Sequence, residues 1–270
     1  MAWNDKALTA VKWQELEYYQ AESLLTPHCF TTRIGGVSKG YLESLNLGTH
    51  RGDEPQNVLR NYEILANALG FNPKQAVLSK QTHSDIIRKV GREEWGAGLF
   101  APELTQCDAL ITNEPSTTLV VFTADCTPIL LWDPVTGAVG AVHAGWRGTA
   151  AGIAGKTVKA METEFGARPE NIKAAIGPNI GQCCFETDRD VPNAILSTYG
   201  QAAEEYILTR NEKYYVNLKA VNALNLRGAG VMDISVSDCC TACQNHRFWS
   251  HRVVGNQRGS QGAVIVCKEG

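Results

Sequence analysis

The chain has 270 residues, 44% of them hydrophobic and 20% charged, and its formal net charge is −3. This composition is typical of soluble globular proteins and excludes the disordered and fibrous classes. No basic cluster indicates a nucleic-acid partner. The most apolar stretch, 119–132, is interrupted by Asp125 and Pro128, so we expect no membrane partner either.

The cysteines and the N-terminal segment bear on the cellular compartment. Residues 1–14 lack the charged region and apolar run that mark a secretory signal. The nine cysteines form an odd set with adjacent pairs at 183–184 and 239–240, which fits reduced thiols better than a disulfide framework. We therefore expect a cytoplasmic protein with free thiols, some of them metal ligands. The sequence leaves the oligomeric state open.

Hydrophobic periodicity predicts the secondary structure. Apolar, β-branched segments predict strands at 76–79, 86–90, 117–123, 128–133, 137–143, 172–178, 232–237 and 263–267. Helical patterns occupy 54–69, 149–165, 188–199 and 217–227. Strands follow one another directly within 118–143, which excludes strict βαβ alternation. No repeat or linker divides the chain, so residues 1–270 are expected to form one α/β (α+β) domain, a mixed sheet flanked by helices.

Three potential metal ligands stand at the ends of predicted strands. His83 lies in KQTHSD, Cys126 follows LVVFTAD, and His143 closes GAVGAV. Two imidazoles and a thiolate suit zinc, and three protein ligands leave the fourth position open for water or substrate. Singly, each residue is more often a packed core or loop residue. Nearby polar residues that are able to orient imidazoles strengthen the metal interpretation; they are Gln81, Asp85 and Asp125.

A second interpretation makes Cys126 a nucleophile and His143 its base, as in cysteine hydrolases. This interpretation needs no metal. It leaves His83 unexplained, so that residue discriminates the two interpretations.

The segment behind His143, AGWRGTAAG, runs from a predicted strand into a helix. Glycines such as Gly145 let backbone N–H groups approach a ligand, and a helix N-terminus favours an anion. Arg147 and this turn therefore form a candidate phosphate or carboxylate site. The alternative is an ordinary strand-to-helix turn with a surface arginine.

Further cysteines invite a second metal interpretation. Residues 240–246 have C-x-x-C-x-x-H spacing, but a structural zinc needs four ligands, and a second pair is not evident unless Cys239 or Cys267 joins. Cys183 and Cys184 are adjacent, and on a strand they would point to opposite faces, so at most one is expected to reach a shared pocket. We therefore expect packed reduced thiols here.

A series of motifs extends over roughly residues 25–267: TTRIGGVS, SLNLGTH, KQTH, DALIT, TADCTPILLWD, AVHAGWRG, IGPNIGQCCFE and CCTACQNHRFWSHR. In this order they resemble the YfiH-like or laccase-domain family, first labelled multicopper polyphenol oxidoreductases. The resemblance implies a single α/β domain similar to the cytotoxic-necrotizing-factor fold, in which His83, Cys126 and His143 bind one zinc. It also implies purine nucleoside phosphorylase activity on adenosine, inosine and methylthioadenosine, with adenosine deaminase activity in the same site.

The substrates implied by the resemblance are a purine nucleoside and phosphate. The candidate residues for binding substrate or phosphate are Arg33, Asn46, Gln81, Gly145 and Arg147, and the candidate catalytic residues are Asp125, Cys126 and His143. Candidates for protonating the purine lie beside motif residues and are Asp108, Asp125 and Glu186.

The chain departs from the family pattern at two positions. RGSQ, residues 258–261, stands where members usually carry Thr-Gly-Arg, so Arg258 is the candidate replacement for that arginine. Tyr62 follows Asn61 where an arginine often stands. Both departures bear on substrate identity more than on metal binding.

Two other activities stay open. Copper binds such ligands more tightly than zinc, so a copper-dependent polyphenol oxidase is one alternative, with Cu²⁺ in place of Zn²⁺. With six histidines in the chain and two in the constellation, a full multicopper set cannot be assembled in one chain. The other alternative is a Cys–His hydrolase that edits peptidoglycan precursors.

Overall fold

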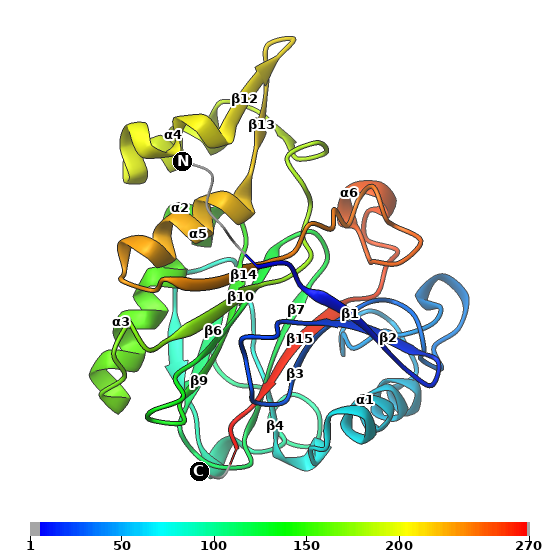
Figure 1. Ribbon diagram of the computed structural model, residues 1–270. Coiled ribbons are helices and arrows are strands. Elements are labelled where there is room, and N and C mark those ends of the chain that lie inside the picture. The colour runs from blue at the N-terminus through cyan, green and yellow to red at the C-terminus, as the bar shows by residue number, and fades with distance from the viewer. Residues whose placement is uncertain (1–5, 269–270) are drawn as a thin grey trace.

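The computed structural model describes Lys6–Lys268 (Figure 1). The described residues do not include 1–5 and 269–270. The first of these ranges is the beginning of the segment 1–14, in which no secretory signal was recognised. Within the described range, no helix combines the length and the apolar character that crossing a membrane requires.

The first six-stranded sheet has the order β1-β2-β3-β15-β7-β4. Its strands are β1 (Thr9–Trp13), β2 (Leu16–Gln20), β3 (His28–Thr31), β4 (Ala76–Leu78), β7 (Thr118–Thr123) and β15 (Gln261–Val266). The C-terminal strand β15 pairs antiparallel with both β3 and β7, whereas β4 runs parallel to β7. Segments from the two ends of the sequence therefore meet in the middle of this sheet.

The second six-stranded sheet has the order β14-β10-β8-β9-β6-β5. Its strands are β5 (Ile87–Lys89), β6 (Ala109–Thr112), β8 (Thr127–Trp132), β9 (Val139–Ala144), β10 (Lys173–Ile176) and β14 (Asp233–Val236). The pairs β5–β6 and β10–β14 are parallel, and the remaining pairs are antiparallel. Both large sheets are thus mixed.

A third, small antiparallel sheet stands apart at one end of the molecule (Figure 1). It comprises β11 (Glu186–Thr187), β12 (Ile207–Arg210) and β13 (Lys213–Val216). The helices are α1 (Pro55–Leu69), α2 (Trp146–Ala150), α3 (Ile153–Phe165), α4 (Asp190–Tyr199), α5 (Leu218–Gly228) and α6 (His251–Val254).

The two large sheets pack face to face, and helices cover their outer faces. Along β7, Leu119 and Val121 enter the core between the sheets, while Val120 faces the opposite core against α1. Along β8, Leu130 points between the sheets and Ile129 points toward α3 and α5. This alternation is the period-2 geometry of a strand buried on both faces. The result is a four-layer arrangement with α1 on one side and α3 and α5 on the other (Figure 1).

The mixed α/β class and the eight strand segments read from the sequence are confirmed. The strands divide between two stacked sheets instead of forming one, because the apolar runs have two buried faces and each sheet needs a partner on both. The helix expected at 149–165 is two helices. Gly152 lies between α2 and α3 with φ +75°, a left-handed conformation that glycine adopts readily and that interrupts the helix.

The expectation for Cys183 and Cys184 is wrong. They lie in a turn between β10 and β11 and not on a strand, so the alternation of a strand does not apply to them. The amide of Cys184 closes the turn by donating to the carbonyl of Gly181 (3.0 Å). Both thiols consequently face the same cluster, which also contains Cys240 and Cys243.

Candidate metal centre and active site

Three loops and strand ends bring the candidate metal ligands together at one end of the stacked sheets. His83 follows β4 of the first sheet, and Cys126 lies where the chain crosses from β7 of the first sheet to β8 of the second. His143 is the penultimate residue of β9 in the second sheet. The ligands therefore come from both sheets, which only their stacking places side by side.

The geometry of the three side chains suits one metal ion. Their ligand atoms all lie within 4.8 Å of one another, and Cys126 Sγ is 3.8 Å from His83 Nε2. The two imidazole rings meet edge to face, with centroids 5.0 Å apart. His143 is buried, Cys126 is partly exposed and His83 is exposed, so the centre is open on the His83 side. Two imidazoles and a thiol with one open side therefore form a candidate metal site with room for one further ligand.

Asp108 orients the two histidines of this centre. Its carboxylate is fully buried and accepts a hydrogen bond from Nδ1 of His143 (2.7 Å), so Nε2 is the nitrogen left for a metal. It also accepts from the amides of His83 (3.0 Å) and Ser84 (2.8 Å) and from the hydroxyl of Ser84 (2.6 Å). Burial alone would raise the pKa of Asp108, but the hydrogen bonds from His143 and Ser84 lower it well below its usual range. The carboxylate–imidazole pair is the arrangement that fixes the tautomer of a metal-binding histidine.

The metal-free charges favour a thiolate beside an imidazolium. Burial opposes ionisation of Cys126, but the charge of His143 and hydrogen bonds from both histidines lower its pKa to about 6. Burial opposes protonation of His143, but the Cys126 thiolate and Asp108 raise its pKa to about 9. The thiolate is the form that binds metal and the form that acts as a nucleophile.

Backbone conformation at the centre is unusual. His83 has φ +61° and Asp125 has φ +87°, values that residues other than glycine adopt seldom. Asp125 is held there by its own carboxylate, which accepts from the Thr241 hydroxyl (2.6 Å) and the Arg252 amide (2.6 Å). At Gly145 an added Cβ would lie 2.8 Å from Cδ2 of His83, so this glycine lets the imidazole pass. Strained residues of this kind cluster at functional sites.

A cavity of about 370 Å³ opens beside the centre, a volume within the usual range of small-molecule sites. His83, Cys126 and His143 form part of its wall. The apolar part of the wall consists of Phe122, Ala124, Trp146, Ile180, Phe185 and Leu218, and the polar part includes Arg51, Gln81, Asp125, His251, Arg252, Arg258 and Ser260. The aromatic side chains of this wall suit a planar apolar group, and its arginines suit an anion.

Two guanidinium groups lie close together in this wall. Burial and, after it, the nearby charge of Arg51 lower the pKa of Arg258, while Asp125 and Cys126 oppose the shift, and together they leave that pKa at about 10. Arg51 donates to the hydroxyl of Ser260 (3.3 Å). Among the ion pairs of the described residues, neither arginine has a carboxylate partner. Two positive charges at one cavity repel each other, so the pair favours the binding of an anion between or beside them.

The candidate substrate residues are placed differently from one another. Gln81 lines the cavity, where its side chain pairs with the backbone N–H and C=O of Phe122 (2.6 and 2.7 Å). Asn46 is buried and bonds to neighbouring backbone, and the Arg33 guanidinium stacks on Trp249 at 3.8 Å. The exposed Arg147 stacks on Trp146 at 4.1 Å. Arg33, Asn46 and Arg147 do not lie in the wall of the cavity. Gly145 is not in the wall either, and it lies against the imidazole of His83.

The residues expected to orient the imidazoles do not do so within the described structure. Asp85 pairs with Lys156, Gln81 bonds to the β7 backbone, and Asp125 bonds to Thr241 and Arg252. Asp108 takes that role because it directly precedes β6, which pairs with β9 and places the carboxylate next to His143. The sequence singled out Asp108, the first residue of DALIT, only as a candidate for protonating the purine and not as the partner of a histidine.

The purine-protonation candidates also separate. Asp125 lines the cavity, whereas Asp108 is buried beneath His143 with its oxygens engaged. Glu186 is exposed on β11 and accepts a hydrogen bond from the hydroxyl of Tyr215.

Arg51 was not singled out from the sequence, because residues 51–54 carry no motif and only the fold brings Arg51 into the wall of the cavity.

Fold and site together define a four-layer α/β protein with an open His/Cys/His centre beside a cavity. The chain belongs to the family described as "Multi-copper polyphenol oxidoreductase laccase", whose profile matches residues 27–268. This confirms the family resemblance seen in the motifs.

Curated relatives and solved structures agree with this assignment. Purine nucleoside phosphorylase YlmD of Geobacillus stearothermophilus is 39% identical over 87% of each chain. A purine nucleoside phosphorylase of Deinococcus radiodurans is 39% identical over 93% of this chain and 92% of its own. The crystal structure of YfiH from Bacillus licheniformis superposes with a TM-score of 0.91 at 35% identity, over 97% of this chain and 99% of that chain. The fold is therefore that of the YfiH and YlmD proteins.

Proposed function

We propose that this protein is a zinc-dependent purine nucleoside phosphorylase that acts on adenosine, inosine and methylthioadenosine and also deaminates adenosine. The observation that carries the proposal is the open His83/Cys126/His143 centre in the wall of a cavity that also presents aromatic faces and paired arginines. The two phosphorylase relatives support the substrate class. The family description keeps oxidation as a second candidate.

The donor set fits zinc. One thiolate and two imidazoles match its ligand preference, and Asp108 holds the tautomer of His143 that leaves Nε2 free. A zinc ion held there would supply Lewis-acid chemistry at its open position for deamination and for orienting the reactants.

The remaining residues divide the substrate between two ends of the cavity. In phosphorolysis, an oxygen of hydrogen phosphate forms a bond to the sugar C1′, the C1′–N9 bond breaks, and the purine leaves with the proton that hydrogen phosphate gives up. Arg51 and Arg258 hold the phosphate, and the rings of Trp146 and Phe185 stack on the purine. Asp125, the one purine-protonation candidate in the cavity wall, faces the substrate while Thr241 and Arg252 fix its carboxylate.

The test combines metal content and turnover in the same samples. Wild type and His83→Ala are purified without added copper, zinc is counted by mass spectrometry, and adenosine is supplied with and without phosphate. Phosphate-dependent release of adenine, lost together with one equivalent of zinc in His83→Ala, supports the proposal. Full turnover in metal-stripped protein would contradict it, and inosine formation reports deamination separately.

The phosphate site has its own matched control. Arg258→Met removes a cavity guanidinium, while Arg147→Met removes one that stacks on Trp146 outside the cavity wall. Hydrogen bonds to charged groups are worth about 1.5–3 kcal/mol, so we expect Arg258→Met to raise the KM for phosphate roughly 10- to 100-fold and Arg147→Met to leave it unchanged. A raised KM for phosphate in Arg147→Met and an unchanged one in Arg258→Met would indicate that phosphate binds at the turn that contains Gly145.

Oxidation with copper is separated by metal loading. Among the described residues, the group that could hold a metal with imidazole ligands contains two of the six histidines, enough for one copper and not for a multicopper set. Polyphenol oxidation that requires added copper and is absent from the zinc form would be a consequence of metal exchange. Equal oxidation by zinc-loaded protein would favour the oxidase.

The closeness of Cys126 and His143, together with pKa shifts that favour a thiolate beside an imidazolium, keeps a cysteine hydrolase open. A metal-bound thiolate is protected from alkylation until the metal is stripped, whereas a free nucleophile reacts at once. Immediate alkylation of Cys126 in zinc-replete protein, with loss of peptide hydrolysis, would favour the hydrolase.

A further inference from the structure

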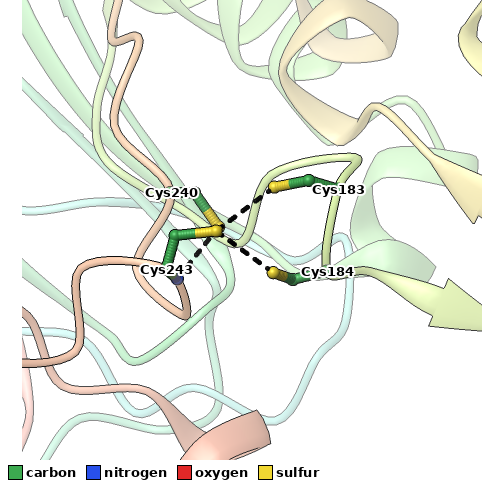
Figure 2. Close-up of side chains that lie close together, drawn as sticks. All are labelled: Cys183, Cys184, Cys240 and Cys243. Atoms are coloured by element: carbon green, nitrogen blue, oxygen red, sulfur yellow. Dashed lines mark hydrogen bonds between the residues drawn. The ribbon is translucent and has the colours of Figure 1, made fainter.

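A second cluster of potential metal ligands lies outside the cavity wall. Cys183 and Cys184 come from the turn between β10 and β11, and Cys240 and Cys243 come from the loop after β14 (Figure 2). All four sulfur atoms lie within 4.8 Å of one another. The Sγ of Cys243 is 3.6 Å from that of Cys183 and 3.4 Å from that of Cys184, far longer than a disulfide bond of about 2.05 Å.

The backbone holds the two segments in this arrangement. Asn179 and Cys240 form an isolated parallel bridge, and the amide of Thr241 donates to the carbonyl of Asn179 (3.0 Å). At Gly181 an added Cβ would lie 3.1 Å from the Sγ of Cys183 and 3.1 Å from the Cβ of Cys240. The segments thus meet more closely than a side chain at Gly181 would comfortably allow.

The distances match those of a tetrahedral thiolate site. Zn–S bonds of about 2.3 Å in a tetrahedron place neighbouring sulfurs about 3.8 Å apart. The two separations from the Sγ of Cys243, 3.4 and 3.6 Å, lie close to this value, and all four sulfurs lie within 4.8 Å of one another. One pair of ligands has C-x-x-C spacing, which is typical of structural zinc sites.

The surroundings are suited to negative charge on sulfur. The amides of Gly181 (3.1 Å) and Cys243 (3.5 Å) both donate to the Sγ of Cys240. The buried ammonium of Lys219 donates to the carbonyl of Cys239 (2.7 Å), and this lysine lines the same surface hollow as Cys183 and Cys240. Amide donors and a nearby cation stabilise thiolates, which carry the charge that a divalent metal only partly neutralises.

We propose that Cys183, Cys184, Cys240 and Cys243 form a closed tetrathiolate site for a soft divalent cation, Zn²⁺ first among them. Binding displaces the protons of those cysteines that are still thiols, and four sulfur ligands leave no open position, so the site is structural. This ion is separate from the one at the His83/Cys126/His143 centre.

The site would brace the wall of the cavity. Arg252 donates from its guanidinium to the carbonyls of Cys184 and Glu186 (both 2.9 Å) and from its amide to Asp125 (2.6 Å). Thr241, within the Cys240–Cys243 loop, donates to the other oxygen of Asp125 (2.6 Å). A metal that ties the two cysteine segments together therefore stabilises the partners that hold Asp125 in its strained conformation.

The test counts and identifies bound metal under reducing conditions. Wild type, Cys240→Ser/Cys243→Ser and the neighbouring control Cys239→Ala are supplied with ZnCl₂, dialysed and measured by mass spectrometry. We expect two zinc ions per chain in wild type and in the control, and one in the double variant. A single zinc in wild type that the double variant retains would overturn the proposal.

X-ray absorption at the zinc edge gives a measurement that does not depend on the cysteine variant folding. His83→Ala weakens the other centre and leaves the four cysteines intact, so its remaining zinc is expected to show four sulfur neighbours at about 2.3 Å. Nitrogen ligands on that zinc, or disulfides among the four cysteines in freshly reduced protein, would contradict the proposal. Neither readout depends on the enzyme's activity, and the proposal rests on the one zinc that separates wild type from the double variant, whatever the metal content of the His83/Cys126/His143 centre.

Discussion

Asp108 offers a sharp test of how the candidate centre is built. In Asp108→Asn, the bond to Nδ1 of His143 loses its charge, and one acceptor oxygen is replaced by an N–H₂ that faces the hydroxyl and amide donors of Ser84. Hydrogen bonds to a charged group contribute about 1.5–3 kcal/mol each, and breaking one member of a buried pair costs about 3–5 kcal/mol. We therefore expect the free energy of unfolding to fall by about 3–5 kcal/mol.

Metal affinity should fall as well, because the imidazole of His143 exchanges a charged acceptor at Nδ1 for a neutral amide oxygen, which makes its Nε2 a weaker ligand. Removing such a partner typically weakens metal binding 10- to 100-fold, equivalent to about 1.4–2.8 kcal/mol. Competition with a chelator measures the zinc affinity of this centre, and urea unfolding measures the stability.

A buried carboxylate elsewhere provides the matched control. Asp133, in the turn between β8 and β9, is also fully buried and accepts from the amide of Val135 and the hydroxyl of Thr136 (both 2.9 Å). Asp133→Asn should lower stability and leave zinc affinity unchanged. Wild-type zinc affinity in Asp108→Asn, or an equal loss in Asp133→Asn, would refute the reasoning.

Two further predictions concern the same centre. In metal-stripped protein, the rate of alkylation of Cys126 should rise with pH around a midpoint near 6, because the Cys126 thiolate pairs with the His143 imidazolium. His143→Ala removes that positive charge and should move the midpoint to higher pH, which peptide mass mapping of the alkylated protein measures. An unchanged midpoint would exclude the ion pair. Gly145→Ala places a Cβ 2.8 Å from Cδ2 of His83 and should reduce zinc affinity at least about tenfold in chelator competition, while Gly228→Ala, where the added Cβ meets open space, should not. Equal affinities in the two glycine variants would show that His83 moves aside freely.

The sign of the pH dependence follows from the direction of each shift. The pKa of Cys126 is lowered, so its ionisation favours the folded metal-free protein increasingly as pH rises from about 6 toward the thiol's ordinary value. The pKa of His143 is raised to about 9, so its contribution is complete below the ordinary histidine value and is lost as pH rises through 9. Between these limits the two contributions oppose each other, and the stability of the metal-free protein should vary little with pH.

Local sequence determined much of the secondary structure. The run at 117–123 is apolar or β-branched at every position, which is typical of a strand buried on both faces, and β7 is that strand. Pro55 at the first turn and Gly70 at the C-terminal end mark the bounds of α1. The candidate trio His83, Cys126 and His143 was also visible in the sequence, because imidazoles and thiols are common metal ligands, and the structure brings the three side chains together.

Only the tertiary structure decided which side chains support that trio. Asp108 was visible as a carboxylate beside a strand, but its place beneath His143 depends on the pairing of β6 with β9, which no local pattern encodes. The placement of Arg258 and Arg51 in one cavity likewise depends on the stacking of segments far apart in the chain.

The cysteine cluster shows the same division. Sequence spacing identified a pair at Cys240 and Cys243, while Cys183 and Cys184 were assigned to opposite faces of a strand that does not form. Residue types and periodicity are properties of the chain itself and can be read along it. The convergence of four thiols, like that of Asp108 and His143, arises from long-range contacts whose partners are chosen only when the sheets pack.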